Sequence, residues 1–410
     1  MKYVIHQRDS CRICSARELR RFLHFDDMPF TDDFVSPQTK GTEFLAPLDI
    51  YWCRECKTSQ TLHDVEVTDY YREYRYTASS SPFAQRFMRH LAEETVRRFG
   101  LLPGAKVIEV GSGDGYQLSC FRQLGSQVLG FEPSAELTMM SQAAGVPVIQ
   151  CLFTADRVQS IPSEMRPADV VLLTYTFDHL PDPLSFLQAV SGVIEEDRGV
   201  LLIEVHDLKK IMERRETCLF AHEHSVYLYE LTMKRLLERA GFKLLTTQLV
   251  PELQRRGNSL LVAAALQQSR HESEPFTRFE NLAPLEEWTP YATFGVEVRR
   301  SYAGLCNYVR SRTRAGLRLS GYGAGGRGVM ALAMADLDNR DITYLCDQNT
   351  SFHNLLTPRS HVPVAAPERL LTEPTDESIV FSFGYMNEIR QQLAPYEERG
   401  GKLISLLDLI

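Results

Sequence analysis

The sequence lacks a long apolar run. No stretch of about 18 apolar residues occurs, so no membrane-spanning helix is predicted. The opening residues MKYVIHQRDSCRIC have no apolar segment after their basic residue and do not resemble a secretory signal, so we expect a cytoplasmic protein. A formal charge of -8, without a basic cluster interleaved with aromatics, argues against a nucleic-acid partner.

The composition also lacks any strong bias. Hydrophobic residues make up 44% and charged residues 24% of the chain, which excludes a disordered chain or a fibre. A chain of 410 residues is too long for one ordinary core, so two or three domains are expected. The cysteines number nine, which is odd, so we interpret them as thiols and metal ligands rather than as a disulfide framework.

Four of these cysteines form two pairs near the start of the chain. Cys11 and Cys14 form CRIC, and Cys53 and Cys56 form CREC. Two such pairs can hold one ion, and zinc is favoured because a d10 ion accepts tetrahedral thiolates without redox cost. Four protein ligands leave no open position, so the site is expected to be structural. The interval between the pairs is long for a zinc ribbon, which leaves an iron–sulfur centre or coincidental thiols as alternatives.

The stretch VIEVGSGDGYQL at 107–118 is typical of a strand, a glycine loop and a helix. Gly111, Gly113 and Gly115 let the backbone turn tightly beneath a ligand. The next predicted strand ends at Glu132, where an acid can accept hydrogen bonds from the ribose hydroxyls of an adenosine. The alternative is a tightly packed turn that binds nothing.

The form E-x-G-x-G-x-G resembles the first motif of class I S-adenosylmethionine-dependent methyltransferases. This resemblance implies that the cofactor is bound by Glu109, Gly111, Gly113, Gly115, Glu132 and Pro133. Further apolar runs at 168–177 and 198–205, followed by a hairpin at 242–266, predict a seven-stranded sheet with an antiparallel edge.

The stretch CLFAHEHSVYLYELT at 218–232 follows the fifth predicted strand, beside the predicted donor site. A histidine poised near neutral pH suits a general base, and a neighbouring carboxylate can orient it. We therefore predict His224 as the base, Glu223 as its partner and His222 as a substrate-binding residue. A solvated turn with incidental histidines is the alternative.

A second glycine loop, GYGAGGRG at 321–328, follows another predicted strand. Gly321, Gly323 and Gly326 satisfy G-x-G-x-x-G, and the next strand ends at Asp347. Alone this would indicate an NAD-dependent oxidoreductase. The remaining chain holds only about half of a dinucleotide domain of two βαβαβ units, however.

Several marks spread along the chain resemble the nucleotide-sugar C-methyltransferases of deoxysugar biosynthesis. They are the two cysteine pairs, YREYRYTASSS at 71–81, EVGSGDG, GFEPS, HEH at 222–224, RGNSL at 256–260, GYGAGGRG and SHVPV at 360–364. The resemblance implies an α/β protein of three parts. These are a zinc-binding domain at 1–82, a class I methyltransferase domain with a Rossmann-like sheet at 83–268, and a smaller Rossmann-like nucleotide-sugar-binding domain at 269–410.

The resemblance also implies roles for individual residues. A methyl group would pass from S-adenosylmethionine to the sugar carbon beside a keto group, through an enolate formed by His224. Tyr76 would face the reacting sugar, and His179 would be a further histidine of the pocket. Asn258, Gly323 and Arg327 would contact the nucleotide-sugar, the last two at its diphosphate.

Two positions depart from the family pattern. Ala221 stands where a tyrosine usually precedes HEH, and Arg327 replaces a lysine. These changes keep open O- or N-methylation of another acceptor, beside an oxidoreductase or a binding module that has kept the methyltransferase fold without its chemistry. We expect Met139 and Met140 to lie in the core because they have helical spacing and small apolar neighbours. The sequence does not indicate an oligomeric state.

Overall fold

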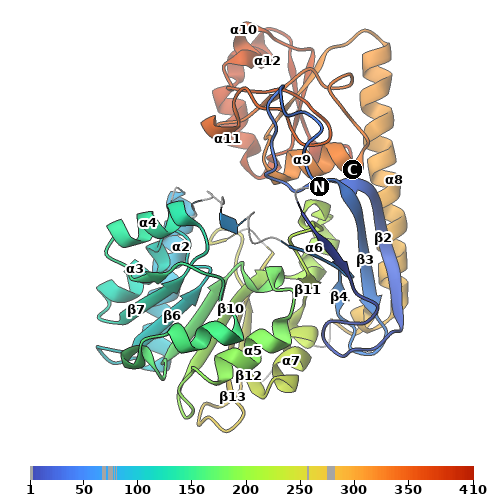
Figure 1. Ribbon diagram of the computed structural model, residues 1–410. Coiled ribbons are helices and arrows are strands. Elements are labelled where there is room, and N and C mark those ends of the chain that lie inside the picture. Colours follow the sequence, from blue (N-terminus) through green and yellow to red (C-terminus); the bar gives the residue numbers. More distant parts are fainter. Residues whose placement is uncertain are drawn as a thin grey trace.

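The computed structural model describes residues 3–66, 71–72, 77, 79, 81–255, 258–274 and 282–410. Figure 1 shows a central sheet flanked by helices, an N-terminal sheet beside it, and a C-terminal sheet at the far end of a long helix. Within the described residues, none of the helices combines the length and apolar character that a membrane crossing requires.

The central sheet has seven strands in the order β12-β13-β10-β9-β6-β7-β8. Its strands are β6 (Lys106–Val110), β7 (Gln127–Phe131), β8 (Val148–Ile149), β9 (Val170–Thr174), β10 (Val200–His206), β12 (Phe242–Leu249) and β13 (Ser259–Leu266). All neighbours pair in parallel except β13, which runs antiparallel to β10 and β12. This confirms the predicted seven-stranded sheet with an antiparallel hairpin at its edge.

Helices cover both faces of this sheet, and they are α2 (Pro82–Phe99), α3 (Tyr116–Gln123), α4 (Ala135–Ala143), α5 (Pro183–Ser191) and α7 (Glu230–Arg239). The short helix α6 (Leu208–Arg214) follows β10 and packs instead in the core of the N-terminal sheet. Because side chains alternate along a strand, Val107 of β6 belongs to the core on the α3 side, with Leu118. Its neighbour Ile108 belongs to the opposite core, with Leu187 of α5 and Leu236 of α7. The parallel strands are therefore buried on both faces, which explains their continuous apolar sequences.

The N-terminal sheet includes one strand from the middle of the chain. Its order is β11-β4-β3-β2, and all pairs are antiparallel. The strands are β2 (Leu19–Met28), β3 (Ala46–Cys53), β4 (Ser59–Gln60) and β11 (Val226–Tyr227), with β1 (Ile5–Gln7) and β5 (His63–Val65) forming a separate pair. Because β11 begins two residues after His224, its pairing with β4 ties the histidine stretch to the N-terminal sheet.

The C-terminal sheet has five parallel strands in the order β16-β15-β14-β17-β18. The elements are α8 (Trp288–Arg314), β14 (Leu319–Tyr322), α9 (Gly326–Met334), β15 (Leu345–Cys346), β16 (Val364–Ala365), α10 (Arg369–Thr372), β17 (Glu377–Val380), α11 (Met386–Gln392), α12 (Ala394–Glu398) and β18 (Lys402–Ser405). A smaller Rossmann-like sheet was predicted here, and this topology agrees with it.

The long helix α8 connects the N-terminal and C-terminal sheets. Tyr291 near its start packs in one core with Trp52 of β3, and Val309 near its end belongs to the same core as Leu319 of β14. In Figure 1, α8 runs beside β2 and continues to the C-terminal sheet. The strand β11 joins the N-terminal sheet, and α8 packs against both the N-terminal and C-terminal sheets. The domain boundaries 1–82, 83–268 and 269–410 therefore remain predictions.

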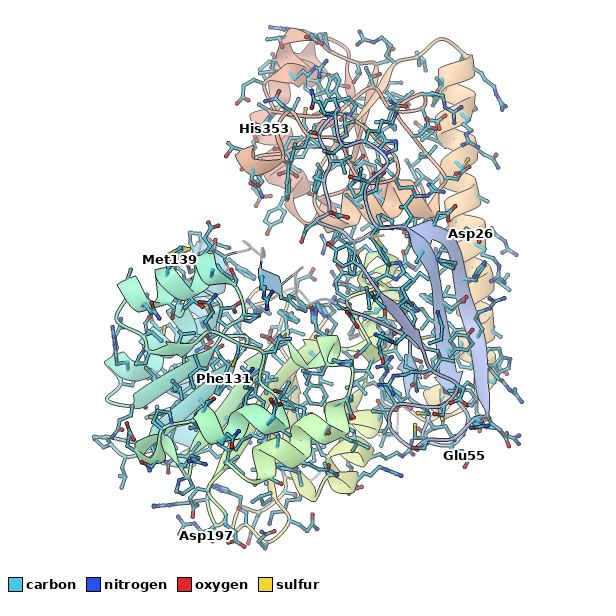
Figure 2. The ribbon with its side chains drawn as sticks, in the orientation of Figure 1. Asp26, Glu55, Phe131, Met139, Asp197 and His353 are labelled. Carbon is cyan, nitrogen blue, oxygen red and sulfur yellow. The ribbon has the colours of Figure 1, made fainter. Side chains whose placement is uncertain are left out.

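The prediction that Met139 and Met140 lie in the core is wrong. Their side chains are 63% and 42% exposed, and Figure 2 labels Met139 on the outside of α4. The buried positions of this helix are instead Leu137, Thr138 and Ser141. Residues adjacent in a helix point in different directions, so the polar side chains of Thr138 and Ser141 take the inner face.

Candidate active site

The four predicted zinc ligands come together in the structure. The Sγ atoms of Cys11, Cys14, Cys53 and Cys56 all lie within 4.8 Å of one another, with 3.5 Å between Cys11 and Cys56 and 3.6 Å between Cys14 and Cys53. A tetrahedral ion with Zn–S bonds of about 2.3 Å would separate its sulfurs by about 3.8 Å. The cluster therefore fits one zinc ion bound by four thiolates.

The two cysteine pairs adopt matching turns. Ser15 N donates to Cys11 O at 2.9 Å, and Lys57 N donates to Cys53 O at 2.9 Å. Ser15 and Lys57 have φ values of 61° and 65°, the left-handed conformation that closes each turn. Gln60 Nε2 donates to Cys11 Sγ at 2.9 Å, a contact that favours the thiolate form.

The first glycine loop has the geometry that a nucleotide-type ligand requires. Gly111, Gly113 and Gly115 have φ values of 72°, 55° and 78°. A Cβ at Gly111 would lie 2.4 Å from Thr176 Oγ1, and one at Gly115 would lie 2.2 Å from Ser141 Oγ. At Gly113 a Cβ would meet no atom within 4 Å, so the open side of the loop is at the middle glycine.

Glu132 closes this loop from the end of β7. Its Oε2 accepts from Gly113 N at 2.9 Å and its Oε1 accepts from Ser134 N at 2.8 Å, across the half-buried Pro133. Burial raises the pKa of Glu132, and the two backbone donors counter this effect. Each carboxylate oxygen keeps a further lone pair, so ribose hydroxyls can still donate to it.

Glu109, at the fourth position of β6, carries a buried carboxyl oxygen that has no protein donor. Among the described residues, Oε2 has no hydrogen-bond partner, and the side chain is 2% exposed. Burial, followed by the negative charges of Asp114 and Glu132, raises the pKa of Glu109 well above its usual value. A protonated carboxyl group beside the glycine loop can donate to a bound ligand. These features fit S-adenosylmethionine.

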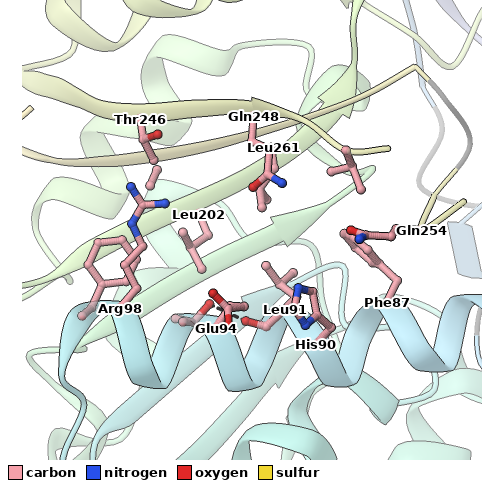
Figure 3. Close-up of a pocket in the computed structure, with 14 residues that line it drawn as sticks. Phe87, His90, Leu91, Glu94, Arg98, Leu202, Thr246, Gln248, Gln254 and Leu261 are labelled. Carbon is pink, nitrogen blue, oxygen red and sulfur yellow. Dashed lines mark hydrogen bonds between the residues drawn. The ribbon is translucent and has the colours of Figure 1, made fainter. Parts of the chain in front are cut away.

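A pocket of about 140 Å³ lies elsewhere in this domain, between α2 and strands β10, β12 and β13 (Figure 3). Phe87, Leu91 and Leu261 line it, with Glu94 and Gln248 also at its wall. None of the predicted site residues is among those that line it. This pocket is therefore separate from the ends of the parallel strands.

The histidine stretch forms a turn that sends its two histidines to different places. His224 N donates to Ala221 O at 3.2 Å, which closes the turn. His222 is 4% exposed and lies between Phe30 and Phe44. Its Nε2 donates to Met28 O at 3.0 Å and its Nδ1 lies 2.9 Å from His63 Nε2.

Both ring nitrogens of His222 are thus committed to the N-terminal part of the protein. Burial, and then the neighbouring His63, lower the pKa of His222 to about 3. The geometry does not support the predicted substrate-binding role. His222 instead holds the histidine stretch against the N-terminal part.

His224 lies at the ends of the parallel strands, as predicted. Ser225 N donates to Asp178 O at 2.8 Å, which brings the neighbouring His224 against the 3-10 helix η4 (Phe177–His179). The His224 ring centroid is 4.7 Å from that of His179. His224 Nδ1 lies 2.6 Å from Leu219 O, and because a carbonyl can only accept, Nδ1 carries a proton. In the neutral ring, Nε2 therefore holds the lone pair.

Three further residues surround this ring. One ring nitrogen each of His179 and His224 and one carboxylate oxygen of Asp178 lie within 4.8 Å of one another. His206 Nδ1 lies 2.9 Å from Asp178 Oδ2, and Tyr71 OH lies 2.8 Å from His179 Nδ1. The sequence alone assigned no role to Asp178, His206 or Tyr71. The sequence signal that could have indicated Asp178 was its position directly before His179.

Among the described residues, Glu223 makes no hydrogen bond to His224, whose Nδ1 is held by Leu219 O. Glu223 is 8% exposed, and its Oε1 accepts from Thr31 Oγ1 at 2.9 Å. Tyr76, the tyrosine predicted to face the substrate, lies outside the described residues. Thr31 is a contact that no sequence pattern indicated, because it comes from a segment 192 residues away.

Tyr227 takes up the space beside Ala221. Its hydroxyl accepts from Ala221 N at 3.2 Å and donates to Ala221 O at 3.3 Å, while its ring centroid is 6.2 Å from that of His224. Burial raises the pKa of Tyr227 well above its usual value, so the phenol stays protonated. Tyr229 instead bonds to Glu286, away from the turn.

Asn258 is buried behind the strand ends. Its Nδ2 donates to Glu216, and its backbone O accepts from Asp207 N at 2.7 Å. Its Oδ1 has no partner among the residues that the structure describes. The contact of Asn258 with substrate stays a prediction. In the structure, Asn258 links the start of β13 to the segment before η5 (Thr217–Leu219).

In the second glycine loop, the close approaches do not follow the G-x-G-x-x-G spacing. A Cβ at Gly323 would lie 2.2 Å from Ser382 Oγ, and one at Gly328 would lie 2.1 Å from Gly323 O. At Gly326 the nearest atom would be Thr31 Cβ at 3.5 Å, an ordinary contact. Gly328 rather than Gly326 therefore lets α9 pack against β14, and Thr31 lies between this loop and Glu223.

Arg327 follows this loop in the first turn of α9. Among the described residues it has no ion pair with a carboxylate, and its guanidinium lies 4.6 Å from the ring centroid of Phe383. Burial raises the pKa of Cys218, and the positive charge of Arg327 partly counters this rise. Arg327 therefore lies near η5, which contains Cys218. Asp347 Oδ2 accepts from Ala324 N at 2.7 Å, so Asp347 holds the glycine loop in place.

Comparison with known protein families supports all three parts of the chain. Residues 11–71 match a zinc binding domain, residues 84–247 match a methyltransferase domain, and residues 254–407 match a C-methyltransferase C-terminal domain. The last match begins in the loop between β12 and β13.

Individual relatives differ in how much of the chain they match. The C-methyltransferase NovU of Streptomyces niveus is 28% identical over 409 residues, which cover 98% of this chain and 96% of NovU. The protein-L-isoaspartate O-methyltransferase of Gloeobacter violaceus is 30% identical over 117 residues, 28% of this chain and 53% of the relative.

Similar solved structures cover about half of the chain. The magnesium protoporphyrin IX methyltransferase of Synechocystis is 13% identical with a TM-score of 0.37, and covers 48% of this chain and 97% of its own. The 1,6-didemethyltoxoflavin-N1-methyltransferase of Burkholderia thailandensis is 19% identical with a TM-score of 0.34, and covers 44% and 79%.

The four-thiolate cluster, the glycine loop on a seven-stranded methyltransferase sheet, and the full-length match agree with one another. S-adenosylmethionine is the methyl donor, and zinc is the structural metal. The chain is an S-adenosylmethionine-dependent C-methyltransferase that matches a zinc binding domain, a methyltransferase domain and a C-methyltransferase C-terminal domain in turn.

Proposed function

We propose that this enzyme methylates a carbon beside the keto group of a nucleotide-linked sugar, with His224 as the general base. The observation that carries the proposal is the orientation of His224. Its Nδ1 is bound to Leu219 O, so the lone pair of Nε2 is available near the ends of the parallel strands. A carbon acid needs a base of this kind, because a C–H bond must lose its proton before it can accept a methyl group.

The reaction can be assigned to residues as follows. His224 Nε2 takes the proton from the carbon beside the keto group, and the C–H electron pair becomes the enolate. Bound S-adenosylmethionine supplies an electrophilic methyl group, and the electron pair of the broken C–S bond stays on sulfur. The proton on His224 then returns to solvent.

Two further groups are suited to contact the acceptor. His179 lies beside His224, and burial followed by the charge of His224 lowers the pKa of His179, so this ring stays neutral. Tyr71 holds the other nitrogen of the same ring. We propose that His179 contacts the acceptor and that the buried carboxylate of Glu223, with Oε2 unused by described residues, binds an acceptor hydroxyl.

The second glycine loop supports a nucleotide diphosphate as the handle of the acceptor. Backbone N–H groups at the start of α9 point outward from the helix, where they favour an anion. Arg327 lies in that first turn without a carboxylate partner in the described part of the chain. Thr31 donates to Glu223 and lies beside Gly326, so the proposed phosphate and sugar ends of the acceptor adjoin the same residue.

The test is a mass-spectrometric assay in deuterated water with S-adenosylmethionine and a panel of nucleotide-linked 4-keto sugars. The expected product gains one methyl group. Without the donor, the acceptor should gain one solvent deuterium at the carbon beside the keto group. Methyl gain without exchange would instead indicate an O- or N-nucleophile. No methyl gain on any keto sugar, despite measured donor binding, would refute the proposal.

A further inference from the structure

We propose that Asp178, held by His206, is a positioning residue that stabilises the positive charge formed on His224 when it accepts a proton. The inference rests on the proposed role of His224 as the base. It assigns to Asp178 and His206 the function that sequence reasoning gave to Glu223.

The geometry of Asp178 is that of a carboxylate waiting for a positive charge. It is 4% exposed, and Oδ2 is bound to His206 Nδ1 at 2.9 Å. Its Oδ1 has no hydrogen-bond partner among the described residues and lies 3.9 Å from His179 Nε2. A buried carboxylate oxygen without a donor is costly, and a cation forming within 4.8 Å offsets that cost.

The charge states favour this role. Burial alone would raise the pKa of Asp178, but the His206 hydrogen bond and the nearby His224 and His179 lower it below its usual value. Asp178 is therefore negative at neutral pH. Burial and His224 lower the pKa of His179, so this ring does not compete for the proton.

His206 is itself fixed by a buried chain of contacts. Its ring stacks on Tyr175 with centroids 4.3 Å apart and planes 23° apart. The guanidinium of Arg255 lies 4.9 Å from the Tyr175 ring centroid, and Arg255 Nε donates to Glu204 Oε1 at 2.8 Å. Through these contacts, the buried Arg255–Glu204 ion pair holds Tyr175 in place, and Tyr175 prevents the His206 ring from rotating away from Asp178.

The other charged groups near the cluster do not replace Asp178. Glu223 is hydrogen-bonded to Thr31, and the described residues that contact the cluster from other elements are Tyr71, Tyr175 and Tyr227. The charge of Arg12 acts on Tyr227. Arg12 is paired with Asp64 at 2.8 Å. Among the described residues, Asp178 is thus the carboxylate that faces both His179 and His224.

The first measurement needs no acceptor. NMR spectra of protein labelled with nitrogen-15 in histidine are recorded against pH for the wild type and for Asp178→Asn, with His224→Gln identifying the His224 signals. Removing an opposite charge at this range should move the titration midpoint of those signals down by about one pH unit or more. An unchanged midpoint overturns the inference, whether or not the protein methylates sugars.

The second measurement uses the reaction. Asp178→Asn should lower kcat about 10- to 100-fold and move the rising limb of the kcat profile to lower pH, while the Kd for S-adenosylmethionine stays unchanged. Asp178→Glu should restore part of the rate. A loss of kcat without movement of the pH profile would indicate a merely structural role and overturn the inference.

Controls separate folding from electrostatics. Asp182→Ala removes the N-cap of α5 in the same segment, so it should lower stability without moving the His224 midpoint. If Asp178→Asn does not fold, His206→Gln keeps the carboxylate but loosens it, and a smaller shift in the same direction is expected. A wild type that titrates as expected but methylates no keto sugar would refute the proposed function alone.

Discussion

Gln60 Nε2 lies 2.9 Å from Cys11 Sγ, while the backbone of Gln60 pairs with Val226 two residues after His224. One residue of β4 therefore contacts both the thiolate cluster and the strand that follows the histidine stretch. The metal site thus acts on the position of His224 through a short, rigid path.

Loss of zinc should disorder both ends of this path. Cys14→Ser removes one ligand, and structural zinc contributes about 10–16 kcal/mol to the folding of small zinc domains. The variant should lose its bound zinc by elemental analysis, and protease should cut it within the N-terminal sheet. Cys151→Ser, a half-buried thiol outside the cluster, is the matched control and should keep one zinc per chain. Retention of zinc by Cys14→Ser would contradict the assignment.

His224→Gln should abolish proton removal while leaving the fold intact. The glutamine keeps a donor for Leu219 O but cannot accept a proton, so exchange of the acceptor carbon in deuterated water should fall by about 10²- to 10⁴-fold. Binding of S-adenosylmethionine, measured by calorimetry, should not change. His90→Gln on the exposed face of α2 serves as the control. Full exchange in His224→Gln would exclude this histidine as the base.

Glu132→Gln should weaken donor binding. The amide keeps the shape of the side chain but replaces one of the two oxygens that accept from Gly113 and Ser134 with a donor. Lost hydrogen bonds to a charged group typically cost about 1.5–3 kcal/mol, so the Kd for S-adenosylmethionine should rise about 10- to 100-fold. Glu136→Gln, on the exposed side of α4, should bind normally. Equal Kd values for the two variants would argue against the assignment.

Arg327→Ala should affect the acceptor and spare the donor. A guanidinium bound to phosphate is worth about 1.5–3 kcal/mol, so KM for the nucleotide-sugar should rise about 10- to 100-fold. Arg327→Lys should restore part of this, because the charge remains while the fork geometry is lost. Arg390→Ala, on α11, provides the comparison. An unchanged KM would remove the diphosphate from the proposal.

His222 makes the stability of the protein depend on pH. The pKa of this ring is about 3 in the folded protein, against an ordinary value of 6.5. Between these values the unfolded chain binds the extra proton, so the stabilisation is present above pH 6.5 and is lost as pH falls from 6.5 toward 3.

The slope that one such proton contributes is at most about 1.4 kcal/mol per pH unit. His222→Gln should flatten the dependence of the free energy of unfolding on pH in this window, measured by urea titration. His63, its partner, has a pKa that burial lowers in the same direction, so some slope should remain. An unaltered slope in His222→Gln would show that the ring is not held neutral.

Much of the fold was predictable because its signals are local. The apolar strands, the helix that ends at Gly100 and the turns at Gly111 and Gly115 each depend on a few neighbouring residues. Cys11, Cys14, Cys53 and Cys56 were also recognisable, since chelating pairs carry a spacing of their own. The placement of His224 followed from the rule that ligands bind at the carboxyl ends of parallel strands.

The errors arose where packing decides. Nothing near Met139 indicates which side of α4 faces the core, and the HEH triplet does not reveal that a turn sends His222 into the N-terminal part. The G-x-G-x-x-G match at Gly326 likewise does not reveal that the close backbone approach occurs at Gly328. In each case the deciding atoms come from segments distant in sequence.

The sequence by itself determined the strands of the central sheet, the zinc ligands and a histidine stretch after the fifth strand, since each follows from local spacing and periodicity. Only the tertiary structure decided which groups act on that histidine. Leu219 O, Asp178 and His206 reach His224 from three separate segments, and burial together with charge at that meeting point sets what each can do. Distances between such segments depend on the packing of the whole core, which no single stretch of sequence contains.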